Sequence, residues 1–192
     1  ANGDLVESGA QPYFASTTVF NRDGSLALMR SASLDMLHVV NVATLDTLVT
    51  LNVPANDRVF SPDSTLFTYD LFDSSNALIA VHDTATGEQV FSVDALEDNP
   101  RQLALSADNT RLAYATDDTV TVIDMTSGET VYSVTFEGLT LNALVFGGDL
   151  LYVAQFNTLY VLDAAGQILT RTATGDGGFI DDLTISADNR LI

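Results

Sequence analysis

Short apolar runs alternate with small polar clusters along this chain. Residues 101–134 show the pattern most clearly, because runs rich in Val, Leu, Ile, Thr and Tyr are separated there by the clusters SADN, TDD and MTSG. Such runs between Asp, Asn, Ser and Gly clusters are typical of consecutive antiparallel strands joined by tight turns. The pattern predicts a four-stranded meander of about 35 to 40 residues as the unit of the fold.

This unit recurs, and two landmarks mark each copy. The first is an acid in the first turn, at Asp23, Asp63, Asp108 and Asp188, with a degenerate copy at Asp149. The second is the acid or amide that ends the third strand, at Asn41, Asp83, Asp124 and Asp163. Successive landmarks lie 39 to 45 residues apart in both series. A period near 40 residues with four strands per unit predicts an all-β fold, a β-propeller built from four-stranded antiparallel blades.

One propeller domain is expected to cover residues 1–192. Full blades are predicted near 17–53, 58–93, 101–134 and 141–172, and a partial blade near 179–192 begins with a strand over 182–186. The chain opens on Ala1 and stops at Ile192 inside an expected strand. We therefore expect a piece of a longer chain, truncated at both ends, that forms an open arc of a larger ring and exposes apolar blade faces.

The repeats at 61–93 and 106–134 resemble those of bacterial β-propellers of the YVTN/lactonase-like, WD-repeat-like superfamily. The shared pattern is an SPDG-type turn, an apolar strand, a strand that ends in Asp, and a turn such as TATGE or TSGE. It covers roughly residues 17–192, although the chain has no Trp and so lacks the Trp-Asp dipeptide of eukaryotic WD repeats. The resemblance implies two function classes: a non-catalytic binding scaffold, or a lactonase-like or quinoprotein-dehydrogenase-like enzyme whose active site lies partly outside these residues.

Charge narrows the range of partners. The chain carries 26 acidic residues against 7 basic ones, all of them Arg, for a net charge of −19. Such a surface repels phosphate backbones and anionic lipids, so nucleic acid is excluded as a partner. No apolar run approaches the ~18 residues of a membrane helix, so membrane insertion is not expected. Most of the acids are Asp, which fits either turn chemistry or a saline habitat.

The chain has no cysteine, which excludes disulfides, thiolate metal sites and thiol nucleophiles. Its absence is compatible with a reducing or an oxidising compartment, and secreted, periplasmic or cell-surface locations are slightly favoured over the cytoplasm. No cofactor motif is present either. The pair Gly147–Gly148 precedes a strand as an ordinary hairpin turn does, without the lysine of a phosphate-binding loop.

The residues that could perform catalysis are few. The two histidines, His38 and His82, lie on strands expected to be buried, where a structural role is favoured over that of a ligand or base. The motifs H-E-x-x-H, G-x-S-x-G and S-x-x-K are absent. Acid pairs such as Asp117–Asp118 lie in expected turns, where water keeps both carboxylates ionised. No catalytic residue is therefore predicted.

Residues 173–182 form a candidate calcium-binding loop. Asp176, Asp181 and Asp182 are hard oxygen donors among glycines. Their spacing does not match the EF-hand loop, so a solvated connection is the competing interpretation, as it is for the acidic connection 94–100. The repeated landmarks are expected to serve turns and strand ends, because each recurs in every copy. We predict a non-catalytic scaffold that binds a protein or a small ligand on one propeller face.

Overall fold

The described strands all belong to four-stranded antiparallel sheets that follow one another in chain order. The computed structural model describes residues 15–31, 35–72, 77–94, 100–138, 140–175, 178–186 and 191. The sheets are β1 (Ala15–Phe20), β2 (Leu26–Ser31), β3 (Met36–Asn41) and β4 (Thr47–Leu51); β5 (Arg58–Phe60), β6 (Leu66–Phe72), β7 (Ala77–Asp83) and β8 (Gln89–Asp94); β9 (Gln102–Leu105), β10 (Arg111–Ala115), β11 (Thr119–Asp124) and β12 (Thr130–Thr135); and β13 (Leu141–Gly147), β14 (Leu150–Gln155), β15 (Thr158–Leu162) and β16 (Ile168–Ala173).

Each sheet is a simple meander in which every strand pairs with the next along the chain. No helix occurs in the described residues, and with none present, no helical membrane span is found in that part of the chain. The predicted all-β fold with a repeated four-stranded antiparallel unit is confirmed.

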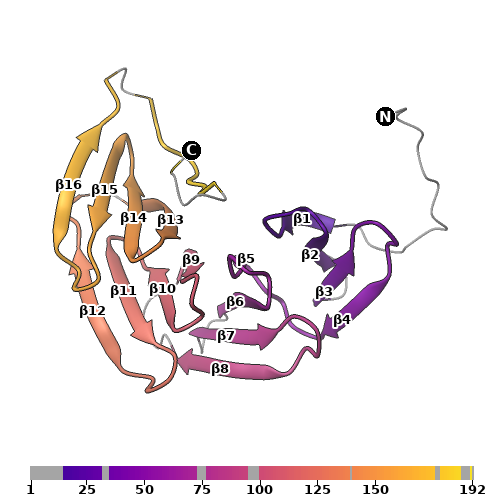
Figure 1. The fold of residues 1–192 in the computed structure, drawn as a ribbon. Helices are drawn as coiled ribbons and strands as arrows, with labels where there is room; N and C mark the ends of the chain where they lie inside the picture. Colours follow the sequence, from indigo (N-terminus) through magenta and orange to yellow (C-terminus); the bar gives the residue numbers. More distant parts are fainter. Residues whose placement is uncertain are drawn as a thin grey trace.

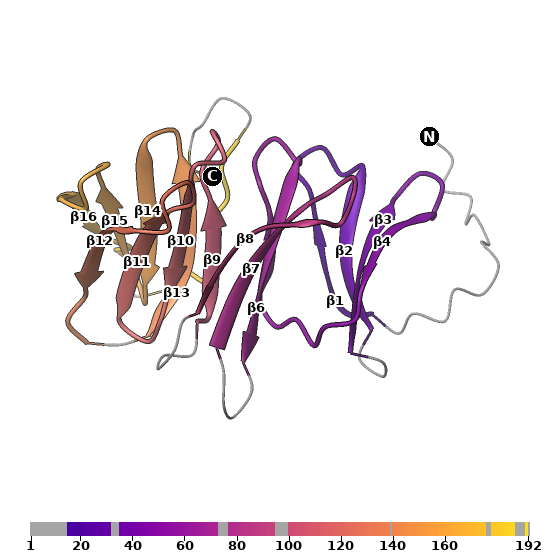
Figure 2. The same ribbon diagram turned by 90° about the horizontal axis from the view of Figure 1, so that it is seen from below.

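The four sheets stand side by side along an arc that is open on one side (Figure 1). The first strand of each sheet lies on the inner side of the arc and the fourth on the outer side. Because the sheets are meanders, the turns after their first and third strands lie on one face, which we name the turn face. Figure 2 shows the sheets from the side, with the strands running between this face and the opposite one, the connection face.

Burial follows the position of a strand in its sheet. Most side chains of β9 and β13 on the inner side are buried. In β8 and β12, half-buried and exposed side chains alternate, because one face of an outer strand meets water. In β16 every side chain is exposed. Outer strands such as β8 and β12 therefore turn one face to water. The inner strands β5 and β9, which have a neighbouring sheet on each side, bury most of their side chains.

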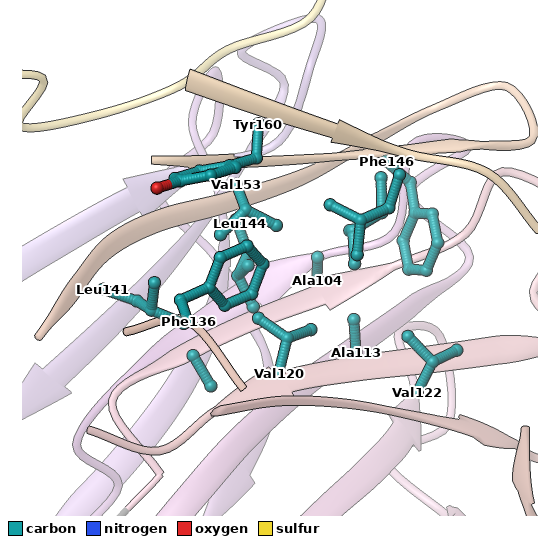
Figure 3. Close-up of a cluster of buried hydrophobic side chains, with 13 residues drawn as sticks. Ala104, Ala113, Val120, Val122, Phe136, Leu141, Leu144, Phe146, Val153 and Tyr160 are labelled. Carbon is teal, nitrogen blue, oxygen red and sulfur yellow. The ribbon is translucent and has the colours of Figure 1, made fainter. Parts of the chain in front are cut away.

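The core consists of three apolar clusters, one at each interface between neighbouring sheets. Figure 3 shows the cluster between the third and fourth sheets, where Val120 and Val122 face Leu144 and Val153. At its edge the rings of Phe136 and Tyr160 meet at 64° with their centroids 4.8 Å apart, an arrangement that favours aromatic pairs. The apolar faces of the sheets are thus buried against each other.

The turns repeat in backbone conformation as well as in sequence. In the first turn, residues at one equivalent position have φ of 72°, 66° and 57°: Gly24, Ser64 and Asn109. In the third turn, the equivalent residues have φ between 61° and 81°: Leu45, Gly87, Gly128 and Gly166. Positive φ suits glycine and is tolerated by Asn, so Leu45 and Ser64 are the strained members of their series.

Residues 178–186 return to the inner side of the arc (Figure 1). The Arg22 guanidinium donates a hydrogen bond to the Ser186 carbonyl, which links the first sheet to this segment. The expected strand over 182–186 is not formed; an isolated antiparallel bridge joins Ile185 to Leu191. A strand needs paired neighbours to be stable, and the described residues offer this segment a single bridge.

Candidate binding site on the turn face

The landmark at the end of each third strand closes the turn that follows it. The Oδ1 atom of Asp124 accepts backbone hydrogen bonds from Thr126 at 2.7 Å and Ser127 at 2.9 Å. Asn41, Asp83 and Asp163 accept backbone hydrogen bonds in the same way from residues two to four positions ahead. These carboxylates and the one amide are therefore engaged with their own turns.

The landmark in the first turn has a similar role. Asp23, Asp63 and Asp108 each accept a backbone hydrogen bond from the residue two positions ahead, at 2.9 to 3.1 Å. In the second and third sheets a serine hydroxyl also donates to the aspartate at 2.6 Å: Ser61 to Asp63, and Ser106 to Asp108. Asp188 lies outside the described residues.

Hydrogen bonding lowers the pKa of several landmark aspartates. The backbone N–H of Ser127 lowers the pKa of Asp124, and that of Thr86 lowers the pKa of Asp83. The Ser106 hydroxyl lowers the pKa of Asp108, against a smaller opposing effect of burial. Donors that bond to the charged form of an acid favour that form. The turn face therefore carries fixed negative charge at neutral and mildly acidic pH.

An apolar cavity of about 160 Å³ lies at the turn-face ends of the four first strands. We define the apolar cavity by one residue from each sheet and one from the returning segment: Phe20, Phe60, Leu103, Phe146 and Ile185. Phe20 keeps 58% of its surface exposed, whereas Leu103 and Phe146 are buried beneath the opening. Each sheet supplies this lining because its first strand lies on the inner side of the arc.

A second cavity, of about 140 Å³, lies between the first turns of the third and fourth sheets. It shares Ala107 and Phe146 with the apolar cavity, so the two adjoin. Its other lining residues include Asp108, Asp149 and Arg111, and we name it the acidic cavity. Sequence reasoning found the landmark Asp108 but neither cavity, because their linings come from strands about 40 residues apart.

Sequence reasoning also missed a buried acid pair near the connection face. Asp70 in β6 is completely buried, and its Oδ1 accepts the backbone N–H of Asp57, just before β5, at 2.5 Å. The Asn56 amide donates to Oδ2 of Asp70 at 3.4 Å. The buried guanidinium of Arg58 bonds the Asn56 carbonyl at 2.6 Å. The signal available in the sequence was one acid inside the apolar run LFTYDLF.

Burial raises the pKa of both members of this pair. The pKa of Asp57 rises to about 7, through burial first and the neighbouring Asp70 charge second. The pKa of Asp70 rises to about 6 through burial, against hydrogen bonds that favour its charged form, the first from the backbone of Asp57. Only Asp57, which is half-buried, is in reach of a ligand.

Both histidines lie in the core, as the sequence predicted. His82 is 6% exposed, and its ring nitrogens lie 3.2 Å from the Tyr69 hydroxyl and 2.9 Å from the Gly87 carbonyl. The imidazole stacks on the rings of Phe67 and Tyr69. His38 is 2% exposed, with Nδ1 3.0 Å from the Thr50 hydroxyl. Each is held by its neighbours in the sheet.

The candidate calcium ligands are not brought together in the described residues. Asp176 lies outside them, and Asp181 and Asp182 are exposed. Asp182 accepts the backbone N–H of Leu183 at 2.8 Å. Across the described ranges, no three Asp, Glu, His or Cys side chains are grouped closely enough to hold a metal ion.

Comparison with known proteins adds no family to this geometry. No protein-family model matches the chain, and no curated protein matches it. The relation to YVTN/lactonase-like propellers is thus a resemblance carried by the repeated turns and strands alone.

Proposed function

We propose that this chain is a β-propeller interaction module, without a catalytic role, that binds a partner polypeptide on its turn face. The observation that carries the proposal is the apolar cavity, which takes its lining from the first strand of every sheet. An exposed aromatic residue such as Phe20 beside a concave apolar site is typical of recognition surfaces. The meander sheets, arrayed with their first strands innermost, support the propeller assignment.

The size of the apolar cavity favours a single side chain as its occupant. Pockets that enclose drug-sized ligands usually measure ~300–1,000 Å³. The cavity's 160 Å³ is smaller than that, which favours an anchoring side chain over a quinone cofactor.

The charge of the turn face defines the partner further. Against Arg22 and Arg111, its turns carry Asp23, Asp46, Asp63, Asp83, Glu88, Asp108, Asp124, Glu129, Asp149 and Asp163. Complementary charge accelerates encounter and selects partners. The proposed partner segment is therefore apolar at its anchor residue and basic in its flanks.

Binding of a small apolar probe tests the proposal. We expect N-acetyl-leucinamide to shift the backbone NMR signals of Leu103, Leu105 and Phe146, with a Kd of about 1 mM or weaker because one apolar side chain is buried. Ala107→Trp fills the opening from an exposed turn position and should abolish these shifts. Ala85→Trp, an exposed alanine of another turn on the same face, is the matched control. Shifts that survive Ala107→Trp would contradict the proposal.

The enzyme alternative has one residue to test. Asp57 combines a raised pKa with partial exposure, a combination found in general acids and bases. A screen of lactone hydrolysis with the parent chain and Asp57→Asn decides this case. Turnover that Asp57→Asn removes would favour the lactonase-like enzyme over the scaffold.

A further inference from the structure

Two neighbouring sheet interfaces differ on the turn face. Between the second and third sheets, Nδ2 of Asn109 donates to Oδ2 of Asp63 at 2.8 Å and to the Thr65 hydroxyl at 3.0 Å. The acid of one first turn is therefore bound by an amide from the first turn of the following sheet. This contact fills the space between the two turns with a hydrogen-bond donor.

In the described residues, the next interface has no side-chain amide at this place. The fourth sheet has a shorter first turn, in which Gly147 ends β13 and Gly148, with φ of 62°, takes the turn conformation. Glycine has no side chain to reach Asp108. In the described residues, the hydrogen bonds of the Asp108 carboxylate come from its own turn: from the Ser106 hydroxyl, and from the N–H and the side chain of Thr110. The acidic cavity lies where the previous interface has its amide.

The charge in the acidic cavity favours a cationic donor as occupant. Asp108 and Asp149 contribute two carboxylates, and Arg111 contributes one guanidinium. An N–H donor that carries positive charge would replace the missing amide and also balance the excess carboxylate. Anionic groups, in contrast, would meet two like charges.

The acidic cavity adjoins the apolar cavity, with Ala107 and Phe146 in both linings. We infer that a partner segment places an apolar side chain in the apolar cavity and a neighbouring Arg or Lys side chain in the acidic cavity, where Asp108 and Asp149 accept its hydrogen bonds. This inference rests on the proposed function and adds a basic residue, at a defined place, to the recognition of the partner.

Short peptides test it. The probes are acetyl-Leu-Arg-amide and acetyl-Leu-Gly-Arg-amide, which carry the basic residue one or two positions after the anchor. Each is compared by NMR titration with the same peptide carrying Gln in place of Arg. We expect at least one arginine probe to bind about tenfold more tightly than its glutamine partner, because charge-assisted hydrogen bonds are about twice as strong as neutral ones. Raising the salt concentration should reduce this advantage.

Two substitutions locate the effect. Asp149→Asn should remove most of the advantage of arginine, since Asp149 lies on an exposed two-residue turn and its loss leaves the core intact. Asp46→Asn makes the same charge change in an exposed turn of the first sheet on this face, and Asp46 lines neither cavity, so this variant should keep the advantage. Equal affinity for the arginine and glutamine probes would overturn the inference, even if acetyl-leucinamide still binds and the proposed function stands. Calcium alone shifting Asp108 and Asp149 would also overturn it, by giving the acidic cavity to a metal ion.

Discussion

The carboxylates of the repeated turns and the pair Asp57–Asp70 have opposite environments. A turn acid such as Asp124 accepts short backbone hydrogen bonds while facing water, and those bonds lower its pKa. Asp70 also accepts a backbone hydrogen bond, but it is completely buried, and burial raises its pKa to about 6. The turns thus favour the charged form of aspartate, whereas the buried site of Asp70 favours the neutral form.

The comparison separates repeated structure from individual sites. Residues that recur at the same position, such as Asp63 and Asp108, serve the turn that recurs with them. Residues that depart from the repeat mark unusual places: Asp70 takes a position where the third and fourth sheets have Ala115 and Ala154. Gly148 also departs from the repeat, because it lies in a shorter first turn than those of the other sheets. The acidic cavity lies beside it.

The largest expected effect comes from truncating the buried acid. At pH 5, where Asp70 is neutral, Asp70→Ala leaves the Asp57 N–H without its acceptor and opens a small cavity. We expect a loss of roughly 2 to 4 kcal/mol in the free energy of unfolding, measured in urea. Asp108→Ala removes an exposed turn acceptor and should cost about 0.5 to 2 kcal/mol, by analogy with lost helix caps. If Asp108→Ala lowered the free energy of unfolding more than Asp70→Ala does, the turn acid and not the buried acid would be the more important for stability.

Next in size is the pH dependence of stability. The raised pKa values, about 7 for Asp57 and about 6 for Asp70, mean that the folded chain binds protons that the unfolded chain has released above about pH 4. Stability contributed by this pair is therefore complete below about pH 4 and is lost as pH rises through 7. The turn acids, with lowered pKa, act in a separate window and lose their contribution as pH falls below about 4.

Urea unfolding between pH 4.5 and 8 measures this. We expect a fall of about 1 to 3 kcal/mol across the range, and a much smaller fall in the double variant Asp57→Asn, Asp70→Asn. Repulsion between the carboxylates of a chain of net charge −19 also grows with pH. The parent and the double variant should therefore be compared at about 1 M salt, which screens exposed charges. An equal slope in both proteins at that salt would exclude the buried pair as its source.

The sequence predicted those parts of the fold that repeat. Strands such as β10 and β11 were predictable because apolar runs and turn residues recur at a fixed period, and Gly87 was recognisable as a turn glycine with positive φ. The apolar cavity was not predictable, since Phe20, Leu103 and Phe146 meet only once the sheets are arrayed. Asp57 and Asp70 could not be paired from sequence, because their contact depends on the strand register.

The smallest expected effect concerns the turn whose landmark is an amide. In the first sheet Asn41 closes the third turn, and Leu45 has φ of 61° where the other sheets have Gly87, Gly128 and Gly166. A left-handed conformation costs a non-glycine residue roughly 1 to 2 kcal/mol, which replacement by glycine would relieve. Glycine also has greater conformational freedom in the unfolded chain, and this offsets part of the stabilisation. Leu45→Gly should therefore stabilise the chain by about 0.5 kcal/mol in urea unfolding.

Two glycine substitutions calibrate this value. Gly128→Ala introduces a Cβ with nothing within 4 Å, so it reports the cost of the backbone alone. Gly87→Ala brings Cβ to 2.6 Å from Cγ1 of Val49 in the preceding sheet and should cost more, because packing between sheets is disturbed as well. A costly Gly128→Ala would show that positive φ is strained for a residue with a side chain. If Leu45→Gly then lowers stability, the half-buried Leu45 side chain contributes more by packing than its backbone loses by strain. The first sheet's third turn would then be stabilised by side-chain contact, in contrast to the glycine turns of the other sheets.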